Sequence, residues 1–437
     1  MHLPYSEPTC VTDASNGAGC KTSAGSRSER ITALNTSVEE QLHVISSGAQ
    51  NIVPLADLRK KLEQDRPLNI KLGVDPTSPD LHLGHAVPLR KMRQFQDLGH
   101  HVTLIIGDGT ALIGDPSGKN TTRPQLSSEQ IAANAQTYVE QAVKILDNAP
   151  DKLTICHNAD WILSMDLKRL LEVCSKFTVA RILERDDFTK RYNAQTPIAL
   201  HEFLYPVMQA YDSVMIKADV EMGGNDQLFN LLAGRELMEK MGMEPQVCLT
   251  MPLLEGIDGV RKMSKSYGNY IGLTEDADSI FGKTMSIPDE MIVRYMRLAS
   301  PLDVAQVDEI ERGLAAGELN PNDEKHRLAR SLCDMYQGAG AGNAAEERFN
   351  AQFRDHAMPE NIEDHACELG ESVYLPGLLK EVGFAGSTSE GRRLIDGGGV
   401  KLNGEALPAK TYEIDGAKLD GAILQAGRLR YVRIVRA

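Results

Sequence analysis

The sequence of 437 residues has no apolar run that approaches the ~18 residues needed to cross a membrane, which excludes an integral helical membrane protein. Its N-terminus lacks the basic stretch and apolar core of a secretory signal. The seven cysteines are widely spaced and form no CxxC pair, so neither a disulfide framework nor a zinc site is indicated. Reduced thiols fit a cytoplasmic protein without a membrane partner, and we expect that location.

Basic residues are fewer than acidic ones. The 47 Lys and Arg stand against 61 Asp and Glu, which gives a net charge of −14. A chain this acidic is not expected to coat nucleic acid over its whole surface. Residues 375–437 differ, because they hold ten Lys and Arg against seven Asp and Glu. That asymmetry is typical of an RNA-contacting appendage on an acidic catalytic body.

The order of the apolar segments predicts an α/β fold. A strand at 69–74, a helix at 83–98 and a strand at 102–106 form a βαβ unit, which implies neighbouring parallel strands. Strands and helices continue to alternate to about residue 270, which predicts a doubly wound parallel sheet. The expected organisation is a disordered leader over residues 1–34, the α/β domain over 35–270, a helical domain over 271–350, a linker over 351–374 and a small α+β domain over 375–437.

The first candidate site is the segment from Gly73 to His85, which contains the letters HLGH. A predicted strand ends, a Pro-rich turn follows, and a helix begins at the two histidines. The first turn of a helix has free N–H groups and the positive end of the helix dipole, so it is a ready anion site. His82 and His85 both lie in that turn, and Gly84 lets a ligand approach the backbone. Thr77 is able to cap the helix and to contact a phosphate; surface histidines that merely cap the helix are the alternative.

The second candidate site is the loop Arg261–Ser266, RKMSKS, which has glycines on both sides. Lys262 and Lys265 flank hydroxyl groups in this loop. A Lys ammonium is a point charge with three donors and is able to follow a moving pyrophosphate. For such a loop taken alone, a solvated basic turn is the alternative.

Together, HLGH and KMSKS resemble the HIGH and KMSKS elements of the class I aminoacyl-tRNA synthetases, over roughly residues 40–437. The resemblance implies a Rossmann-like catalytic domain that uses ATP as Mg-ATP, with no metal site of the protein's own. It also implies a homodimer, a dimerisation insertion at about 125–200 and a helical domain of the anticodon-binding type. Catalytic and phosphate-binding roles fall by this resemblance on His82, His85, Lys262, Lys265, Lys119, Arg123 and Thr77.

A predicted helix around residues 205–212 narrows the resemblance. Tyr205, Gln209 and Asp212 lie at positions i, i+4 and i+7, and therefore on one helix face. The polar stripe fits a pocket wall, where an Asp is able to accept a hydrogen bond from a buried phenol; an ordinary amphipathic helix is the alternative. The segment is similar to the tyrosine-binding helix of tyrosyl-tRNA synthetases.

Two glycine-rich segments follow predicted strands. Gly107–Lys119 makes a tight loop at the carboxyl edge of the sheet, where ligands bind in open α/β folds, and it lacks the spacing of a Walker P-loop. Glu221–Gln227 joins a strand to a helix, and Asp226 is a good N-cap there. By resemblance, Asp115 meets the substrate ammonium together with the tyrosine and glutamine of the helix, and Gln227 lies near the substrate carboxylate. The ATP-binding residues that the resemblance implies are Asp75, Gly84, Gly224, Asp226 and Lys265.

The C-terminal segment from Leu375 resembles an S4 RNA-binding domain, with two short helices, a strand and an Asn-Gly turn. Arg392, Arg393 and Lys401 are the candidate phosphate contacts, which position an RNA rather than specify its sequence. A small helical cap with a solvated basic face is the alternative.

One position departs from the family's pattern. Many tyrosyl-tRNA synthetases carry a tyrosine two residues before the glycine of G-x-D-P-T, where it helps to bind the substrate hydroxyl, and here that position is Lys71. Asp212 is present, so the expected substrates remain L-tyrosine, ATP and tRNA(Tyr). The implied reaction forms tyrosyl-adenylate and pyrophosphate and then transfers tyrosine to the 3′ end of the tRNA. A ligase for tryptophan or another amino acid, and a non-catalytic RNA-binding protein on a synthetase scaffold, are the alternatives.

Overall fold

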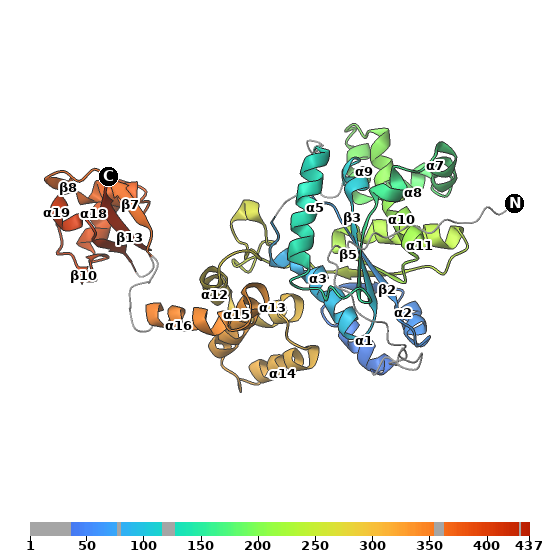
Figure 1. Cartoon of the computed structure of the whole chain (residues 1–437), viewed down its shortest axis with the longest axis horizontal. Coiled ribbons are helices and arrows are strands. Elements are labelled where there is room, and N and C mark those ends of the chain that lie inside the picture. Colours follow the sequence, from blue (N-terminus) through green and yellow to red (C-terminus); the bar gives the residue numbers. More distant parts are fainter. Residues whose placement is uncertain (1–35, 77–79, 116–126, 354–361, 428–429) are drawn as a thin grey trace, which may run out of the picture. The chain divides into compact units, whose positions relative to one another are not determined.

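The computed structural model describes residues 36–76, 80–115, 127–353, 362–427 and 430–437 (Figure 1). The expected leader, together with Thr77, Lys119 and Arg123, lies outside these described residues. The chain divides into two compact units, one ending at Gly342 and the other spanning Asn343–Ala437. Within the described ranges, no helix is both long enough and apolar enough to span a membrane.

The larger unit is built on a six-stranded sheet of order β1-β6-β5-β2-β3-β4. Its neighbouring strands are parallel, except that β1 runs antiparallel to β6 at one edge. The chain runs outward from β2 through β3 to β4 and returns to β5 beside β2, so the strand order reverses between β2 and β5. This confirms the predicted doubly wound α/β fold and puts its ligand crevice at the carboxyl ends of β2 and β5. The strands are β1 Asn51–Val53, β2 Asn69–Val74, β3 His101–Ile106, β4 Leu153–His157, β5 Val220–Gly224 and β6 Val247–Met251.

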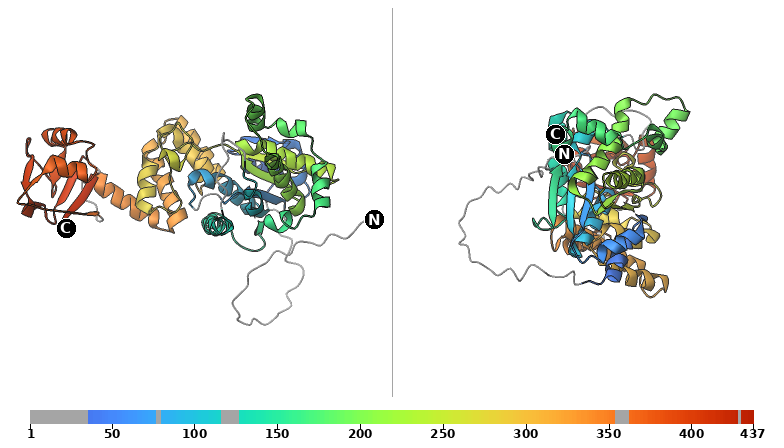
Figure 2. Two further views of the ribbon diagram at one scale, coloured as in Figure 1. Left: turned by 90° about the horizontal axis from the view of Figure 1, so that it is seen from above. Right: turned by 90° about the vertical axis from the view of Figure 1, so that its right-hand side faces the viewer.

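Helices pack on this sheet and extend beyond it (Figure 2). Helix α3 contacts β2, β3 and β5, while α10 and α11 pack on each other and α11 contacts β5 and β6. The expected insertion at 125–200 contains β4, which belongs to the sheet and lies between α5 and α6 in the sequence. The helices are α1 Val38–Ser46, α2 Leu55–Leu62, α3 Leu83–Asp97, α4 Asp108–Ala111, α5 Ser128–Ala142, α6 Ala159–Ile162, α7 Leu167–Cys174, α8 Val179–Leu183, α9 Asp186–Asn193, α10 Leu204–Ile216 and α11 Leu228–Lys240.

The segment after the sheet is helical, as its sequence predicts, and lies in the same compact unit up to Gly342. Helix α13 packs on α3 of the sheet domain as well as on α14 and α15. The helices are α12 Ala277–Met285, α13 Ile292–Ala299, α14 Val304–Ala315, α15 Pro321–Gln337 and α16 Ala341–Phe353; the 3₁₀ turns are η1 Leu200–Phe203, η2 Asn225–Gln227, η3 Lys265–Tyr267 and η4 Asp289–Met291.

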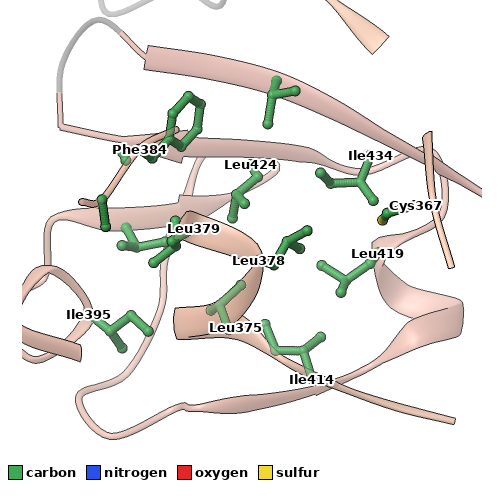
Figure 3. Close-up of a cluster of buried hydrophobic side chains, with 14 of the residues drawn as sticks. Cys367, Leu375, Leu378, Leu379, Phe384, Ile395, Ile414, Leu419, Leu424 and Ile434 are labelled. Atoms are coloured by element: carbon green, nitrogen blue, oxygen red, sulfur yellow. The ribbon is translucent and has the colours of Figure 1, made fainter. Parts of the chain in front are cut away.

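The C-terminal unit has a five-stranded sheet of order β10-β9-β12-β13-β7 and a separate pair, β11-β8. Leucines and isoleucines of its helices and strands form one buried core (Figure 3). Strand β7 pairs with β13 and β8 pairs with β11, so residues 364–374 belong to this unit and the expected linker over 351–374 extends too far. The elements are β7 Asp364–Cys367, β8 Ser372–Tyr374, α17 Leu375–Glu381, α18 Thr388–Asp396, β9 Val400–Leu402, β10 Glu405–Ala406, β11 Glu413–Asp415, α19 Gly416–Leu419, β12 Ile423–Ala426 and β13 Arg430–Arg436.

Candidate active site

The HLGH and KMSKS segments are far apart in the sequence and adjacent in the structure. The Lys265 ammonium lies 2.9 Å from the Asp80 carboxylate, just before the histidines. The backbone N–H of Leu83 donates to the carbonyl of Ile271, at 3.0 Å, and pairing at neighbouring positions extends this contact. The two motifs therefore lie beside each other in the folded chain.

The two histidines lie close together at the start of helix α3, with their rings tilted by 35°. The N-cap is His82, whose ring centroid lies 3.9 Å from that of His85. Its Nδ1 accepts the N–H of Gly84 at 3.1 Å, and Nδ1 of His85 accepts the N–H of His82 at 3.2 Å. Burial, together with nearby positive charge, lowers the pKa of His82 to about 3 and that of His85 to about 4.

The tautomer of each ring follows from these hydrogen bonds. A neutral imidazole whose Nδ1 accepts must carry its proton on Nε2, so both rings have an Nε2–H donor. A Cβ at Gly84 would lie 2.9 Å from Cε1 of His82, which explains why glycine stands between the histidines. The pair therefore offers hydrogen-bond donors, not positive charge, to an anion.

The KMSKS loop is held by one buried side chain. The Asn269 amide accepts the N–H of Ser264 and donates to Asp258 and to the carbonyl of Lys262. Lys262 has an exposed side chain, and its backbone bridges to Glu255. The loop is thus anchored at its base, while its two lysines lie at the surface side.

A carboxylate lies at the carboxyl end of β2. Asp75 accepts hydrogen bonds from the hydroxyls of Thr110, at 2.9 Å, and Tyr205, at 2.8 Å. Burial and the nearby charge of Asp115 raise the pKa of Asp75 to about 7. A Cβ at Gly107 would collide with Oδ1 of Asp75, so this glycine makes room for the carboxylate.

Asp115 is part of a different cluster. Its carboxylate pairs with Arg185 at 2.9 Å and accepts a hydrogen bond from Gln227 Nε2 at 3.1 Å. Arg185 also pairs with Asp187 at 2.8 Å and has a side chain that is 5% exposed. Tyr205 thus bonds to Asp75, while Asp115 pairs with the arginine.

The turn after β5 leaves an exposed carboxylate beside a glycine. Helix α11 has Gln227 as its N-cap, without a side-chain hydrogen bond, so the capping alternative for Asp226 is wrong. The Asp226 side chain is exposed and lies beside Gly224, at which a Cβ would lie 2.5 Å from its Oδ1.

Helix α10 carries the polar stripe expected from the sequence. Asp212 is 2% exposed, and its oxygens accept hydrogen bonds from Trp161 Nε1, at 2.8 Å, and Asn158 Nδ2, at 3.1 Å. Burial raises the pKa of Asp212 to about 6, and the charge of Lys71 opposes that rise. One turn earlier, Gln209 donates from Nε2 to Glu221 at 3.2 Å.

Sequence reasoning missed the partners of these carboxylates. Trp161 is the single tryptophan of the chain, which is a signal, but nothing in the sequence connects it to Asp212. Arg185 lies in a charged helical segment without a motif. Lys71 and Glu221 are opposite charges inside predicted buried strands. Of the missed partners, this pair had the strongest signal in the sequence, because buried charges are expected to pair.

No group of three or more His, Cys, Asp or Glu side chains suited to hold a metal ion occurs among the residues that the structure describes.

In the C-terminal unit, the Arg392 guanidinium lies over the rings of Tyr374 and Tyr412 and donates from Nε to the Tyr374 hydroxyl at 2.8 Å. Arg393 is exposed on the same helix and Lys401 is half-buried in β9.

Comparisons with known proteins agree with this geometry. The chain matches the family described as "tRNA synthetases class I (W and Y)" over residues 63–354. It is 49% identical over 406 residues to a tyrosine–tRNA ligase of Geobacter sulfurreducens, with 92% of this chain and 100% of the relative covered. It is 47% identical over 400 residues to a tyrosine–tRNA ligase of Francisella tularensis, with 92% and 99% covered.

Solved structures share the fold at lower identity. A C-terminally truncated mitochondrial tyrosyl-tRNA synthetase of Aspergillus nidulans has a TM-score of 0.59 at 22% identity, with 74% of this chain and 95% of that chain covered. A tyrosyl-tRNA synthetase of Archaeoglobus fulgidus complexed with L-tyrosine has a TM-score of 0.57 at 23% identity, with 71% and 99% covered.

Proposed function

The chain belongs to the class I tRNA synthetases of the tryptophan and tyrosine group, and we propose that within this group it activates L-tyrosine with ATP and transfers it to tRNA(Tyr). The observation that carries the choice of tyrosine is the buried Asp212 carboxylate on α10. Two N–H groups already hold it in place, and it retains lone pairs for a phenol. Curated relatives named tyrosine–tRNA ligase cover nearly the whole chain and support the same choice.

The activation step needs positioning and charge stabilisation. The carboxylate of tyrosine attacks the α-phosphate of ATP in line, and pyrophosphate leaves. The Nε2–H groups of His82 and His85 donate to phosphate and ribose oxygens, and Lys262 and Lys265 hold the leaving pyrophosphate. Contacts that form mainly in the transition state raise kcat rather than tighten substrate binding. Thr77, Lys119 and Arg123 join this set by the sequence resemblance alone. ATP enters as Mg-ATP, so the magnesium is part of the substrate.

The amino acid and the ribose occupy the crevice at the ends of β2 and β5. Asp212 accepts the phenol, while Tyr205, Gln209 and Asp115 surround the ammonium and Gln227 lies near the carboxylate. Asp75 stands directly behind Tyr205 and orients its hydroxyl. Gly84 and Gly224 give ATP close access to the backbone, and Asp226 binds the ribose. Asp75 and Lys265 are the remaining proposed ATP-binding residues.

The tRNA contacts the C-terminal unit through its phosphates. The proposed contacts are Arg392, Arg393 and Lys401. The guanidinium of Arg392 lies over the rings of Tyr374 and Tyr412, which hold it in a fixed orientation. The helical segment after the sheet is assigned to anticodon binding by the family resemblance.

A homodimer is proposed from the surface of the insertion. Large apolar side chains are exposed there by 61–82% of their area, and a surface of this kind is typical of a protein interface. They are Leu163, Leu167, Leu171, Val179 and Leu200. The cytoplasm is the proposed location, since the widely spaced cysteines fit reduced thiols.

ATP–pyrophosphate exchange with each of the twenty amino acids, without tRNA, tests the proposal. Exchange with tyrosine alone is expected. Exchange with another amino acid would keep the class and refute the Asp212 pocket as a tyrosine site. Exchange with none would favour an RNA-binding protein on a synthetase scaffold.

A further inference from the structure

A buried ion pair lies in the sheet beneath the amino-acid pocket. Lys71 on β2 and Glu221 on β5 are neighbours in register, both side chains are 0% exposed, and Nζ lies 2.8 Å from Oε1. The same register row continues with Thr103 on β3 and Cys248 on β6. The next row consists of Leu72, Leu104, Met222 and Leu249, so the two charges lie directly beside an apolar row of the sheet.

The lysine has no donor left for a ligand. An ammonium group has three protons. Those of Lys71 go to Glu221, to the Ser213 hydroxyl at 2.8 Å and to the backbone carbonyl of Gln209 at 2.9 Å. Lys71 therefore acts on the substrate only through other residues.

The glutamate completes a cradle around α10. Its Oε1 also accepts Nε2 of Gln209 at 3.2 Å, and its Oε2 accepts the Ser213 hydroxyl at 3.2 Å and the amide of Gln246. The pair thus fixes the backbone and side chain of Gln209 and holds Ser213, the residue next to Asp212. These contacts tie the pocket face of α10 to the sheet.

Stability is a weak reason for such a pair. Replacing a buried ion pair by apolar residues of similar volume is often neutral or stabilising, because the desolvation of both charges offsets their attraction. The pair's contacts are directed at Gln209 and at the neighbour of Asp212, and the lysine charge also opposes the effect of burial on the Asp212 carboxyl.

We propose that Lys71 and Glu221 are positioning residues for tyrosine recognition, which hold Gln209 and Asp212 against the sheet and face Asp212 with a compensating positive charge. The pair does not touch the substrate. The proposal rests on the assignment of α10 as the tyrosine-binding helix.

The test compares the full-length protein with the double variant Lys71→Met/Glu221→Gln in ATP–pyrophosphate exchange. We expect the KM for tyrosine to rise by about 10- to 100-fold, as for a small misplacement of binding groups, while the KM for ATP stays unchanged. The preference for tyrosine over phenylalanine is expected to fall by a similar factor. The proposal would be overturned if only the melting temperature changed, while the KM for tyrosine and the preference for tyrosine over phenylalanine stayed the same. Equal rises in KM for tyrosine, phenylalanine and ATP would also overturn it.

Lys61→Met is the matched control. Lys61 is also a buried lysine, 1% exposed, and pairs with Asp219 at 3.2 Å, at the start of β5 and therefore at the opposite end of that strand from the crevice. Its variant is expected to lower the melting temperature and leave the KM for tyrosine unchanged. A rise of that KM equal to the rise in the double variant would refute a specific role for the Lys71 pair.

A single variant keeps the test decisive if the double variant does not fold. Glu221→Gln retains an acceptor oxygen and nearly the same volume, and it is expected to raise the KM for tyrosine without changing that for ATP. An unchanged KM for tyrosine would overturn the proposal. Wild-type protein that gives no exchange with tyrosine would instead refute the proposed function, so the two failures are distinguishable.

Discussion

The Asp212→Asn variant tests how the phenol is recognised. Each carboxylate oxygen of Asp212 accepts an N–H group, one from Trp161 and one from Asn158. An asparagine offers one acceptor oxygen and one NH₂ donor, so one of the two N–H groups will face another donor. Leaving one buried donor without a partner is expected to lower the free energy of unfolding by about 1–3 kcal/mol, which urea denaturation measures.

In the same variant, the loss of kcat/KM for tyrosine is expected to exceed any change in the KM for ATP. Hydrogen bonds to a charged group contribute about 1.5–3 kcal/mol. At about 1.4 kcal/mol for each factor of ten, the loss corresponds to roughly 10- to 160-fold in kcat/KM for tyrosine. ATP–pyrophosphate exchange with tyrosine and with phenylalanine measures it, and the KM for ATP should not change. Equal losses for tyrosine and phenylalanine would refute Asp212 as the acceptor of the phenol hydroxyl.

The remaining predictions concern acid stability, pyrophosphate binding, RNA and dimerisation. Burial lowers the pKa of His82 to about 3 and that of His100 to about 4, below the ~6.5 of an unfolded histidine, so the stability present above pH ~6.5 is lost as the pH falls toward 4. The variant His100→Gln should make the free energy of unfolding, measured by urea denaturation, fall less steeply over this pH range. An unchanged dependence of that free energy on pH would contradict the prediction. Lys265→Met should lower kcat of the exchange by about 10²- to 10³-fold with little change in the KM for ATP; a change in that KM alone would indicate ground-state binding. Deleting residues 362–437 should leave exchange intact and abolish tRNA charging, and persistent charging would remove the RNA role of that unit. Leu171→Asp should shift the protein toward monomer in sedimentation, and an unchanged dimer would exclude this surface.

The parallel strands of the main sheet were predictable because they are apolar and bounded by clear turns. Residues 69–74 match the expected strand, and 101–106 extend the strand expected at 102–106 by a single residue. The pattern predicts a continuous helix over 166–183, but the structure has two helices there. The second begins after Thr178, which has an extended backbone and whose hydroxyl accepts the N–H of Arg181 as an N-cap. The short strands β1, β7 and β8 escaped prediction because three or four residues carry too little periodicity.

The outline of the site was predictable, and its internal contacts were not. HLGH and KMSKS are local patterns, so the sequence by itself indicates one phosphate-binding region. The pairing of Asp115 with Arg185 joins a loop to the remote turn between α8 and α9, so no local spacing encodes it. The partners of Lys71 come from β5 and α10, and they become neighbours only through the order of the strands in the folded sheet.

The pairing of β7 with β13 has a consequence for synthesis of the C-terminal unit. Strand β13 lies between β12 and β7, so the first and last strands of this sheet are neighbours. Strand β7 leaves the ribosome early and has no partner in its sheet until Arg430–Arg436 follows. Until then Cys367, which is buried in the folded unit, lies on an unpaired strand edge of the kind that is prone to wrong pairing.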